Sequence, residues 1–287
     1  MKVTPVKSPT VHTGDDLFQL LNAVLPQLKE KTVVVVTGKV VALCEGAVVV
    51  KKTGDRKEKH DLVRKESELF TDPSQSSYDL MLTVKNQILA VNAGIDESNA
   101  DGKYVLFPEK PYQSAEKIWC YLRAKHHVQN LGVIIIDSRT FPLKWGTIGT
   151  ALAHCGLAAL NNRIGEKDLF GVEMKMTQEN VVEALAVAAN FEMGEVDEAQ
   201  PFAIVTDITK VQFQNRPPTL AEIAELQISI HDDAYAPILK NAGWKKGGQY
   251  LPPKNNSKIE WFLDRKIADK DERWVQLKID LIVCKSA

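Results

Sequence analysis

Three short acidic turns in this chain, each at the end of an apolar run, carry residue types suited to metal and phosphate chemistry. They are Asn92-Ala93-Gly94-Ile95-Asp96-Glu97-Ser98-Asn99, Asp137-Ser138 and Met193-Gly194-Glu195. Carboxylate and hydroxyl oxygens are the ligands that hard divalent cations prefer, and such cations in turn bind phosphates. The three turns together predict one site for a metal ion and a nucleotide.

Each turn also has a simpler interpretation. Asp96 and Asn99 can hydrogen-bond the backbone of their own turn, as Asp and Asn side chains often do. Glu195 can be a solvated residue behind a helix that ends at Gly194. Asp137 directly follows four apolar residues, so it must lie at the mouth of a strand or be strongly desolvated. Spacing alone does not show that the three turns converge.

The composition indicates an ordinary globular protein. With 287 residues, 44% of them hydrophobic and 25% charged, the chain suits one large domain or two modest ones. Its 36 Lys and Arg residues nearly balance 37 Asp and Glu residues, which leaves a net charge of -1. We therefore expect no nucleic-acid partner and no attraction to an acidic membrane surface.

The cysteines and the N-terminal segment indicate a cytoplasmic protein. Cys44, Cys120, Cys155 and Cys284 form no Cys-x-x-Cys pair, so neither a zinc knuckle nor a disulfide framework is predicted. The first sixteen residues lack the apolar segment of a signal peptide, and no apolar run reaches the length of a membrane span.

The apolar pattern predicts alternating helices and strands. We expect helices at 17–28, behind a cap at Asp15 or Asp16, at 114–127, at 146–160, and from Thr177 to a C-cap at Gly194. We expect strands at 32–37, 132–136 and 202–205, with Asp137 at the end of the second, and a hairpin at 80–92. The charged stretch 51–65 is expected to be a solvated connection. These elements predict a core at 1–206, with a polar C-terminal lobe at 207–287.

Familiar nucleotide and metalloprotease fingerprints are absent from the sequence. It contains no Gly-x4-Gly-Lys-Ser/Thr, no Gly-x-Gly-x-x-Gly behind a strand and no His-Glu-x-x-His. P-loop kinases, Rossmann dehydrogenases and zincins are therefore disfavoured.

Several motifs, in order along the chain, resemble the coenzyme F(420)-0:gamma-glutamyl ligase family. The most specific is Ala93-Gly94-Ile95-Asp96-Glu97-Ser98-Asn99, which is similar to the family's Ala-Gly-Ile/Val-Asp-x-Ser-Asn turn. The others are Gly14-Asp15-Asp16-Leu17, residues 36–46, Leu106-Phe107-Pro108-Glu109, Asp137-Ser138, residues 146–157 and Met193-Gly194-Glu195. Together these motifs cover the chain from about residue 5 to residue 206.

The resemblance implies a role for each matched residue. Asp96, Asp137, Ser138 and Glu195 would hold a divalent metal, Mn or Mg, and Lys39 would contact a phosphate. The nucleotide, GTP in that family, would contact Asn99 and the stretch Met193, Gly194, Glu195, Val196, Asp197 and Glu198. Lys39, Asp96 and Asp137 would be the catalytic residues. The resemblance also implies an α+β fold of mixed, largely antiparallel sheets flanked by helices, and a homodimer.

The chemistry of these residue types suits amide ligation. A free carboxylate is a poor electrophile, so joining it to the amine of L-glutamate first requires an acyl phosphate. Metal ions held by carboxylates stabilise the charge that develops on transferred phosphate, and Lys39 adds a further positive charge. We therefore expect a GTP- and metal-dependent ligase with a small-molecule acceptor such as coenzyme F(420)-0.

One segment departs from the family pattern and bears on the acceptor. Where the family has Gly-Arg-Pro-aromatic-Arg, this chain has Arg139-Thr140-Phe141-Pro142-Leu143-Lys144-Trp145. Arg139 or Lys144 can supply the missing cation, although Lys is not a bidentate substitute for Arg. A folate-type polyglutamylating ligase stays open as an alternative, as does a nucleotide-binding regulatory module that has lost ligation.

Overall fold

The structure, a computed structural model, describes residues 1–250 of the chain. The chain folds into two compact units. Unit 1 comprises Met1–Gly46 and Pro108–Pro218, and the described part of unit 2 comprises Ala47–Phe107 and residues 219–250. Each unit is thus assembled from two separate segments, so the units do not follow a single division at residue 206. The expected ligase core at 1–206, with an appended lobe at 207–287, stays a prediction. Residues 251–287, which include Cys284, lie outside the described part.

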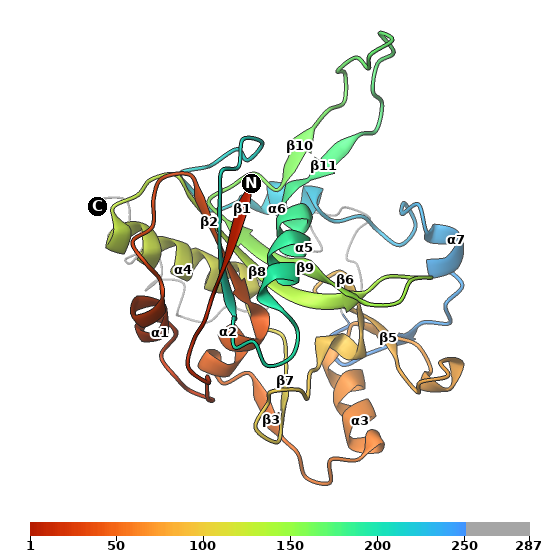
Figure 1. Cartoon of the computed structure of the whole chain (residues 1–287). Coiled ribbons are helices and arrows are strands. Elements are labelled where there is room, and N and C mark those ends of the chain that lie inside the picture. Colours follow the sequence, from red (N-terminus) through yellow and green to blue (C-terminus); the bar gives the residue numbers. More distant parts are fainter. Residues whose placement is uncertain (251–287) are drawn as a thin grey trace. The chain divides into compact units, whose positions relative to one another are not determined.

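Unit 1 is built on a five-stranded sheet with the order β1-β12-β2-β8-β9 (Figure 1). Its strands are β1 Lys2–Val6, β2 Thr32–Thr37, β8 Leu131–Thr140, β9 Thr147–Cys155 and β12 Phe202–Thr206. Only the pair β2 and β8 is parallel among the pairs of this sheet. The expected α+β class with mixed, largely antiparallel sheets is confirmed.

The central strands are those that the sequence marks most clearly. Val33, Val34, Val35 and Val36 of β2 are completely buried, as are the aliphatic residues 133–136 of β8. A strand buried on both faces must be apolar at every position, and β-branched side chains fit that pleated surface well. The predicted strands at 32–37, 132–136 and 202–205 are therefore confirmed.

The helices of unit 1 are α1 Leu17–Val24, α2 Gly38–Glu45, α4 Pro111–His126 and α5 Val181–Met193. Helices α2, α4 and α5 pack against this sheet, and α1 packs against α2. Asp16 caps α1 by accepting hydrogen bonds from the backbone N–H groups of Phe18 and Gln19. From α4, the indole of Trp119 donates to the Leu131 carbonyl of β8 at 2.7 Å. The predicted helices at the start of the chain, at 114–127 and before Gly194 exist, although the first ends at Val24 and not at residue 28. The expected start of the last helix at Thr177 is wrong, because residues 178–180 form a short strand and Asn180 caps the helix from Val181.

The predicted helix at 146–160 is wrong. Thr147–Cys155 is the edge strand β9, antiparallel to β8. The many Ala and Gly residues suggested a helix, but tertiary packing requires them in a strand: a Cβ at Gly149 would lie 2.3 Å from the Ala186 carbonyl of α5. Beyond β9, the short strands β10 Leu160–Asn162 and β11 Gln178–Asn180 form a separate pair and begin a long arm (Figure 1).

Unit 2 contains two small antiparallel sheets. One has the order β13-β4-β5-β6 and the other pairs β3 with β7. Its strands are β3 Val48–Val50, β4 Leu69–Phe70, β5 Leu82–Lys85, β6 Ile88–Val91, β7 Lys103–Val105 and β13 Lys245–Lys246. Its helices are α3 Arg56–Glu66, α6 Leu220–Glu225 and α7 Ala236–Leu239, with short 3-10 turns at Pro73–Gln75 and Asn92–Gly94. The predicted hairpin at 80–92 is confirmed as β5 and β6.

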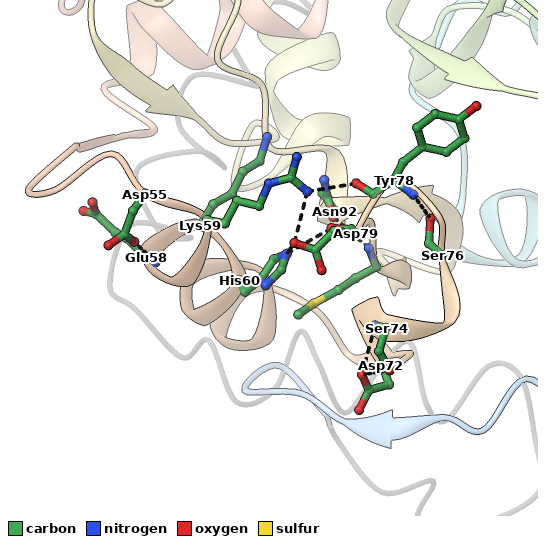
Figure 2. Close-up of polar contacts among 12 residues, drawn as sticks. Asp55, Glu58, Lys59, His60, Asp72, Ser74, Ser76, Tyr78, Asp79 and Asn92 are labelled. Carbon is green, nitrogen blue, oxygen red and sulfur yellow. Dashed lines mark hydrogen bonds and ion pairs between the residues drawn. The ribbon is translucent and has the colours of Figure 1, made fainter.

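The charged stretch 51–65, expected to be a connection, instead folds largely into α3. Asp55 caps the helix by accepting from the Glu58 N–H, while Leu62 and Val63 supply a narrow buried stripe. Figure 2 shows His60 and Asp79 facing one another beside this helix; the His60 Nε2 lies 3.0 Å from the Asp79 carbonyl. Only Leu62 and Val63 of this helix are buried, which is why the charge pattern concealed it.

No helix in the described part, residues 1–250, combines the length and apolar character needed to cross a membrane.

Candidate functional site

The Asp96–Asn99 turn of unit 2 is held by its own hydrogen bonds. Oδ1 of Asp96 accepts from the backbone N–H groups of Glu97 at 2.6 Å and Ser98 at 2.9 Å, and from the Ser98 hydroxyl at 2.9 Å. The Asp96 backbone forms a two-way bridge with Val105 of β7. Asp96 therefore does cap its own turn, the simpler role that the sequence allowed. Its role as a metal ligand stays a prediction.

Tight packing places the start of this turn. Gly94 has a φ of +67°, and a Cβ there would lie 1.9 Å from the Phe107 ring. A residue with a side chain would be strained and would also collide with a buried aromatic. Asn99, the predicted nucleotide contact, has a φ of +47°, a conformation that Asn adopts more readily than most residues. The backbone conformation thus explains why glycine and asparagine occur at positions 94 and 99, in addition to any role in binding.

Glu97, inside the same turn, binds two lysines. Its Oε2 accepts from Lys51 Nζ at 2.7 Å, and its Oε1 accepts from Lys59 Nζ at 2.6 Å. Burial alone would raise the pKa of Glu97, but the hydrogen bonds and charges of the two lysines outweigh it and lower that pKa. Sequence reasoning missed these three residues, since no pattern links positions 51, 59 and 97.

The β8–β9 hairpin of unit 1 carries two of the predicted metal ligands. Asp137 and Ser138 lie within β8, which continues to Thr140, so the expectation that the strand ends at Asp137 is wrong. Asp137 pairs with Thr150 of β9, and Ser138 pairs with Gly149. Gly149 lets α5 rest directly on this part of the hairpin, because its missing side chain leaves room for the Ala186 carbonyl.

Glu195 joins the same hairpin just behind the C-terminal end of α5. Its Oε1 accepts from the Thr147 hydroxyl at 3.2 Å and from the Asn190 side chain at 2.7 Å. Thr147 pairs with Thr140 at the end of β8. Unit 1 therefore brings Asp137, Ser138 and Glu195 to one hairpin, although they are almost 60 positions apart in sequence. Sequence reasoning missed Thr147 and Asn190.

The remaining predicted nucleotide contacts of unit 1 lie at two helix ends. Lys39 is half-buried in the first turn of α2. Met193 is the buried last residue of α5, and Gly194 is its C-cap with a φ of +82°. In the turn that follows, Val196 is exposed, and its N–H donates to the Glu198 carboxylate at 2.9 Å. Hydrogen bonds from backbone N–H groups, first that of Val196, lower the pKa of Glu198.

The predicted ligand set suits an oxygen-preferring divalent cation. Asp96, Asp137, Ser138 and Glu195 offer carboxylate and hydroxyl oxygens, the donors that Mg and Mn prefer over zinc. Within residues 1–250, no three His, Cys, Asp or Glu side chains gather closely enough to hold a metal among themselves. Asp96 belongs to unit 2, whereas Asp137, Ser138 and Glu195 belong to unit 1. Convergence of the four residues stays a prediction.

Arg139, a candidate replacement for the family's cation at the acceptor, points to Glu183 of α5. Its guanidinium lies 3.9 Å from Glu183 Oε2, while the Thr150 hydroxyl donates to Glu183 Oε1 at 2.9 Å. In the described residues, the buried Arg139 Nε and Glu183 Oε2 have no hydrogen-bond partner. Arg139 lies two positions after Asp137 on β8, so an unused donor and an unused acceptor lie close to that carboxylate along the strand.

The fold is α+β, and the β8–β9 hairpin carries an oxygen-rich candidate site for a hard cation.

Residues 5–207 match the family described as F420-0:Gamma-glutamyl ligase. The chain is 32% identical to a Coenzyme F420:L-glutamate ligase of Methanopyrus kandleri, over 71% of this chain and 86% of the relative. A protein of the same name from Methanothermobacter thermautotrophicus is 31% identical over 69% of this chain and 84% of the relative. The chain belongs to the F420-0:gamma-glutamyl ligase family, which confirms the resemblance seen in its motifs.

Proposed function

We propose that this protein is a GTP- and divalent-metal-dependent ligase that joins L-glutamate to a carboxylate-bearing acceptor such as coenzyme F(420)-0. One observation carries the proposal: the similarity to the Methanopyrus kandleri ligase extends over 86% of that relative. Asp137 and Ser138 on the β8–β9 hairpin, with Glu195 hydrogen-bonded to Thr147 of the same hairpin, support it. A cytoplasmic location is part of the same proposal.

The reaction has two chemical steps. An oxygen of the acceptor carboxylate attacks the γ-phosphorus of GTP, so that the bond to the bridging oxygen breaks and GDP leaves. The amine of L-glutamate then attacks the acyl phosphate carbon, loses a proton and displaces inorganic phosphate, leaving an amide. Activation as an acyl phosphate is needed because a carboxylate lacks a usable leaving group.

The residues of this chain have distinct roles in that proposal. Asp96, Asp137, Ser138 and Glu195 would hold the metal, which would supply positive charge to stabilise the transferred phosphate. Lys39 contacts a phosphate from the first turn of α2. Asn99 and residues 193–198 contact the nucleotide. Lys39, Asp96 and Asp137 are the residues on which turnover depends most directly.

A folate-type acceptor is the second candidate, because the altered segment after Ser138 leaves the identity of the acceptor open. Leu143 and Trp145, at the tip of the β8–β9 hairpin, are strongly exposed, and Arg139 is directed to Glu183. An acceptor-binding surface made from these residues differs from one made with the family's usual Gly-Arg pair. Acceptor choice is therefore the part of the proposed function that depends most on this chain's own sequence.

We also propose that the protein is a homodimer. The loop of the β10–β11 arm exposes large apolar residues, with Leu169 at 99% and Phe170 at 92% of full exposure. An apolar arm that extends from its sheet is typical of a segment covered by another subunit. Light scattering should give twice the monomer mass for the native protein and the monomer mass for a Leu169→Glu, Phe170→Glu variant.

The activity test is phosphate release from GTP with Mn or Mg, with and without L-glutamate and each candidate acceptor. We expect release that requires both L-glutamate and one acceptor, with a mass increase of that acceptor by one glutamyl unit. Tight nucleotide binding without acceptor-dependent release would instead indicate a regulatory module and would overturn the ligase proposal. Replacing GTP by ATP in the same assay tests nucleotide choice.

A further inference from the structure

Glu97 connects the Asp96–Asn99 turn to two other elements of unit 2. Lys59 belongs to α3, where Figure 2 shows it next to Glu58 and His60. Lys51 directly follows β3, the strand that pairs with β7. Because one carboxylate oxygen binds each lysine, at 2.7 Å and 2.6 Å, Glu97 links the turn to the helix and to the end of the strand at the same time.

Both lysines are themselves held in place. The loop between them wraps around the carboxylate of Glu58, which accepts from the backbone N–H groups of Lys52, Thr53 and Gly54 at 2.7 to 2.8 Å. The Lys51 ammonium also lies 5.0 Å from the centre of the buried Tyr104 ring. The Lys51 and Lys59 side chains are 25% and 21% exposed, less than is usual for surface lysines.

Global stability is a weak explanation for this arrangement. Partly exposed ion pairs contribute little to stability, and ordering two long side chains has an entropic cost. The arrangement does have a geometric consequence, since Glu97 is the neighbour of Asp96 and lies two positions before Asn99. Residues that orient metal ligands from outside the coordination sphere affect metal affinity strongly.

We propose that Glu97 is a positioning residue, which uses Lys51 and Lys59 to hold Asp96 and Asn99 in the orientation that binds the metal and the nucleotide. The inference rests on the proposed function, because it takes Asp96 as a metal ligand. The β7 bridge fixes where the turn begins, and Glu97 fixes its direction relative to α3.

Replacing Lys59 separates positioning from simple electrostatics. Lys59→Met removes a positive charge near the proposed cation site, so Coulomb's law alone predicts tighter metal binding. A positioning role for Glu97 predicts weaker metal binding, because in Lys59→Met the Asp96–Asn99 turn loses its link to α3. Lys59→Arg keeps both the charge and the donor, so it should retain most of the metal affinity.

The experiment titrates Mn into the full-length protein and follows the metal-induced rise in melting temperature, with no turnover required. The same titration is repeated with GTP present. Lys59→Met and Glu97→Gln should each raise the half-saturating Mn concentration by about tenfold. The matched control is Asp101→Asn, which removes a nearby carboxylate that lies 3.5 Å from the Lys103 ammonium. That control should stay close to the native protein.

Each outcome decides a separate point. Unchanged or tighter Mn binding in Lys59→Met overturns the positioning role, and so does equal weakening in Glu97→Gln and Asp101→Asn. If Glu97→Gln does not fold, Lys51→Met joins Lys59→Met as the second test, because each leaves one ion pair in place. Asp96→Asn tests the metal assignment separately from the positioning role of Glu97. If this variant binds Mn as the native protein does, the assignment of Asp96 as a metal ligand is overturned, whatever the result for Lys59→Met.

Discussion

Thr147 donates its hydroxyl hydrogen to the carboxylate of Glu195 at 3.2 Å, which joins the edge strand β9 to the residue just behind α5. Asn190 reaches the same carboxylate oxygen at 2.7 Å from within the helix. A strand and a helix thus hold one carboxylate from two sides. This arrangement indicates that the orientation of Glu195 is fixed by the fold before any ligand binds.

Asn190→Ala should weaken metal-supported nucleotide binding with little loss of stability. The variant removes the shorter of the two hydrogen bonds to Glu195 and lets that carboxylate rotate. A lost hydrogen bond of this kind costs about 1 kcal/mol, or about fivefold in affinity. Calorimetric titration of nucleotide with Mn measures the change, and Glu192→Gln, an exposed substitution on the same helix, is the control. Equal affinities in both variants would contradict the role given to Asn190.

Asp137→Asn should abolish metal-supported nucleotide binding while leaving the fold intact. The amide has nearly the same shape as the carboxylate, so the strand pairing with Thr150 should survive. The substitution removes the negative charge that a divalent cation requires. Circular dichroism checks folding, and nucleotide binding is compared with that of Asp207→Asn, an exposed position near β12. Native binding by Asp137→Asn would refute the assignment of that carboxylate.

Gly94→Ala should destabilise the protein much more than Gly102→Ala. Both glycines have a positive φ, +67° and +72°, so both alanines carry backbone strain of about 1 kcal/mol. Only the Cβ at position 94 meets a neighbour within 4 Å, the Phe107 ring, which adds an overpacking cost of about 1–3 kcal/mol. Urea unfolding measures both variants. Similar losses would show that Phe107 moves aside freely.

Tyr104→Phe should leave stability unchanged or slightly increased. The Tyr104 ring is completely buried in unit 2, and its hydroxyl has no hydrogen-bond partner within residues 1–250. Removing an unsatisfied buried hydroxyl recovers part of its desolvation cost, which is about 1–3 kcal/mol. Tyr104→Ala, which removes the ring as well, should cost about 3–5 kcal/mol. A clear loss in Tyr104→Phe, seen by thermal unfolding, would mean that the hydroxyl is hydrogen-bonded in solution.

His126 should make the protein less stable as the pH falls below about 6.5. Burial, with the nearby charges of Lys125 and His127, lowers the pKa of His126 below its ordinary value of 6.5. The unfolded chain then binds more protons, so this contribution to stability is present above pH 6.5 and is lost as pH falls toward the lower folded pKa. The loss can reach about 1.4 kcal/mol per pH unit.

Unfolding experiments at several pH values test this expectation. Nδ1 of His126 accepts from the Leu28 N–H at 3.2 Å, and the Asn amide oxygen can replace that acceptor without titrating. His126→Asn should therefore give a flatter dependence of the unfolding free energy on pH between 5 and 7. If the unfolding free energies of the native protein and the variant change with pH in parallel, His126 is not the cause of the pH dependence.

The sequence by itself determined the aliphatic core and the residue types of the site. Runs such as 33–36 and 133–136 permit one interpretation, since a strand buried on both faces must be apolar throughout. The motif around Asp96 and Asn99 is also local, because the backbone angles and the hydrogen bonds of a turn depend on neighbouring residues. Family membership followed from such motifs, and the comparison confirmed it.

Only the tertiary structure decided the elements whose local pattern is ambiguous. Residues 147–155 have the small side chains of a helix but form β9, because Gly149 must admit the backbone of α5. Helix α3 was hidden by its charges, since only Leu62 and Val63 are buried. The partners of Glu97 and Glu195 likewise come from distant positions, which no spacing rule connects. Chain neighbours set a turn, but packing between distant segments decides which side chains hold it.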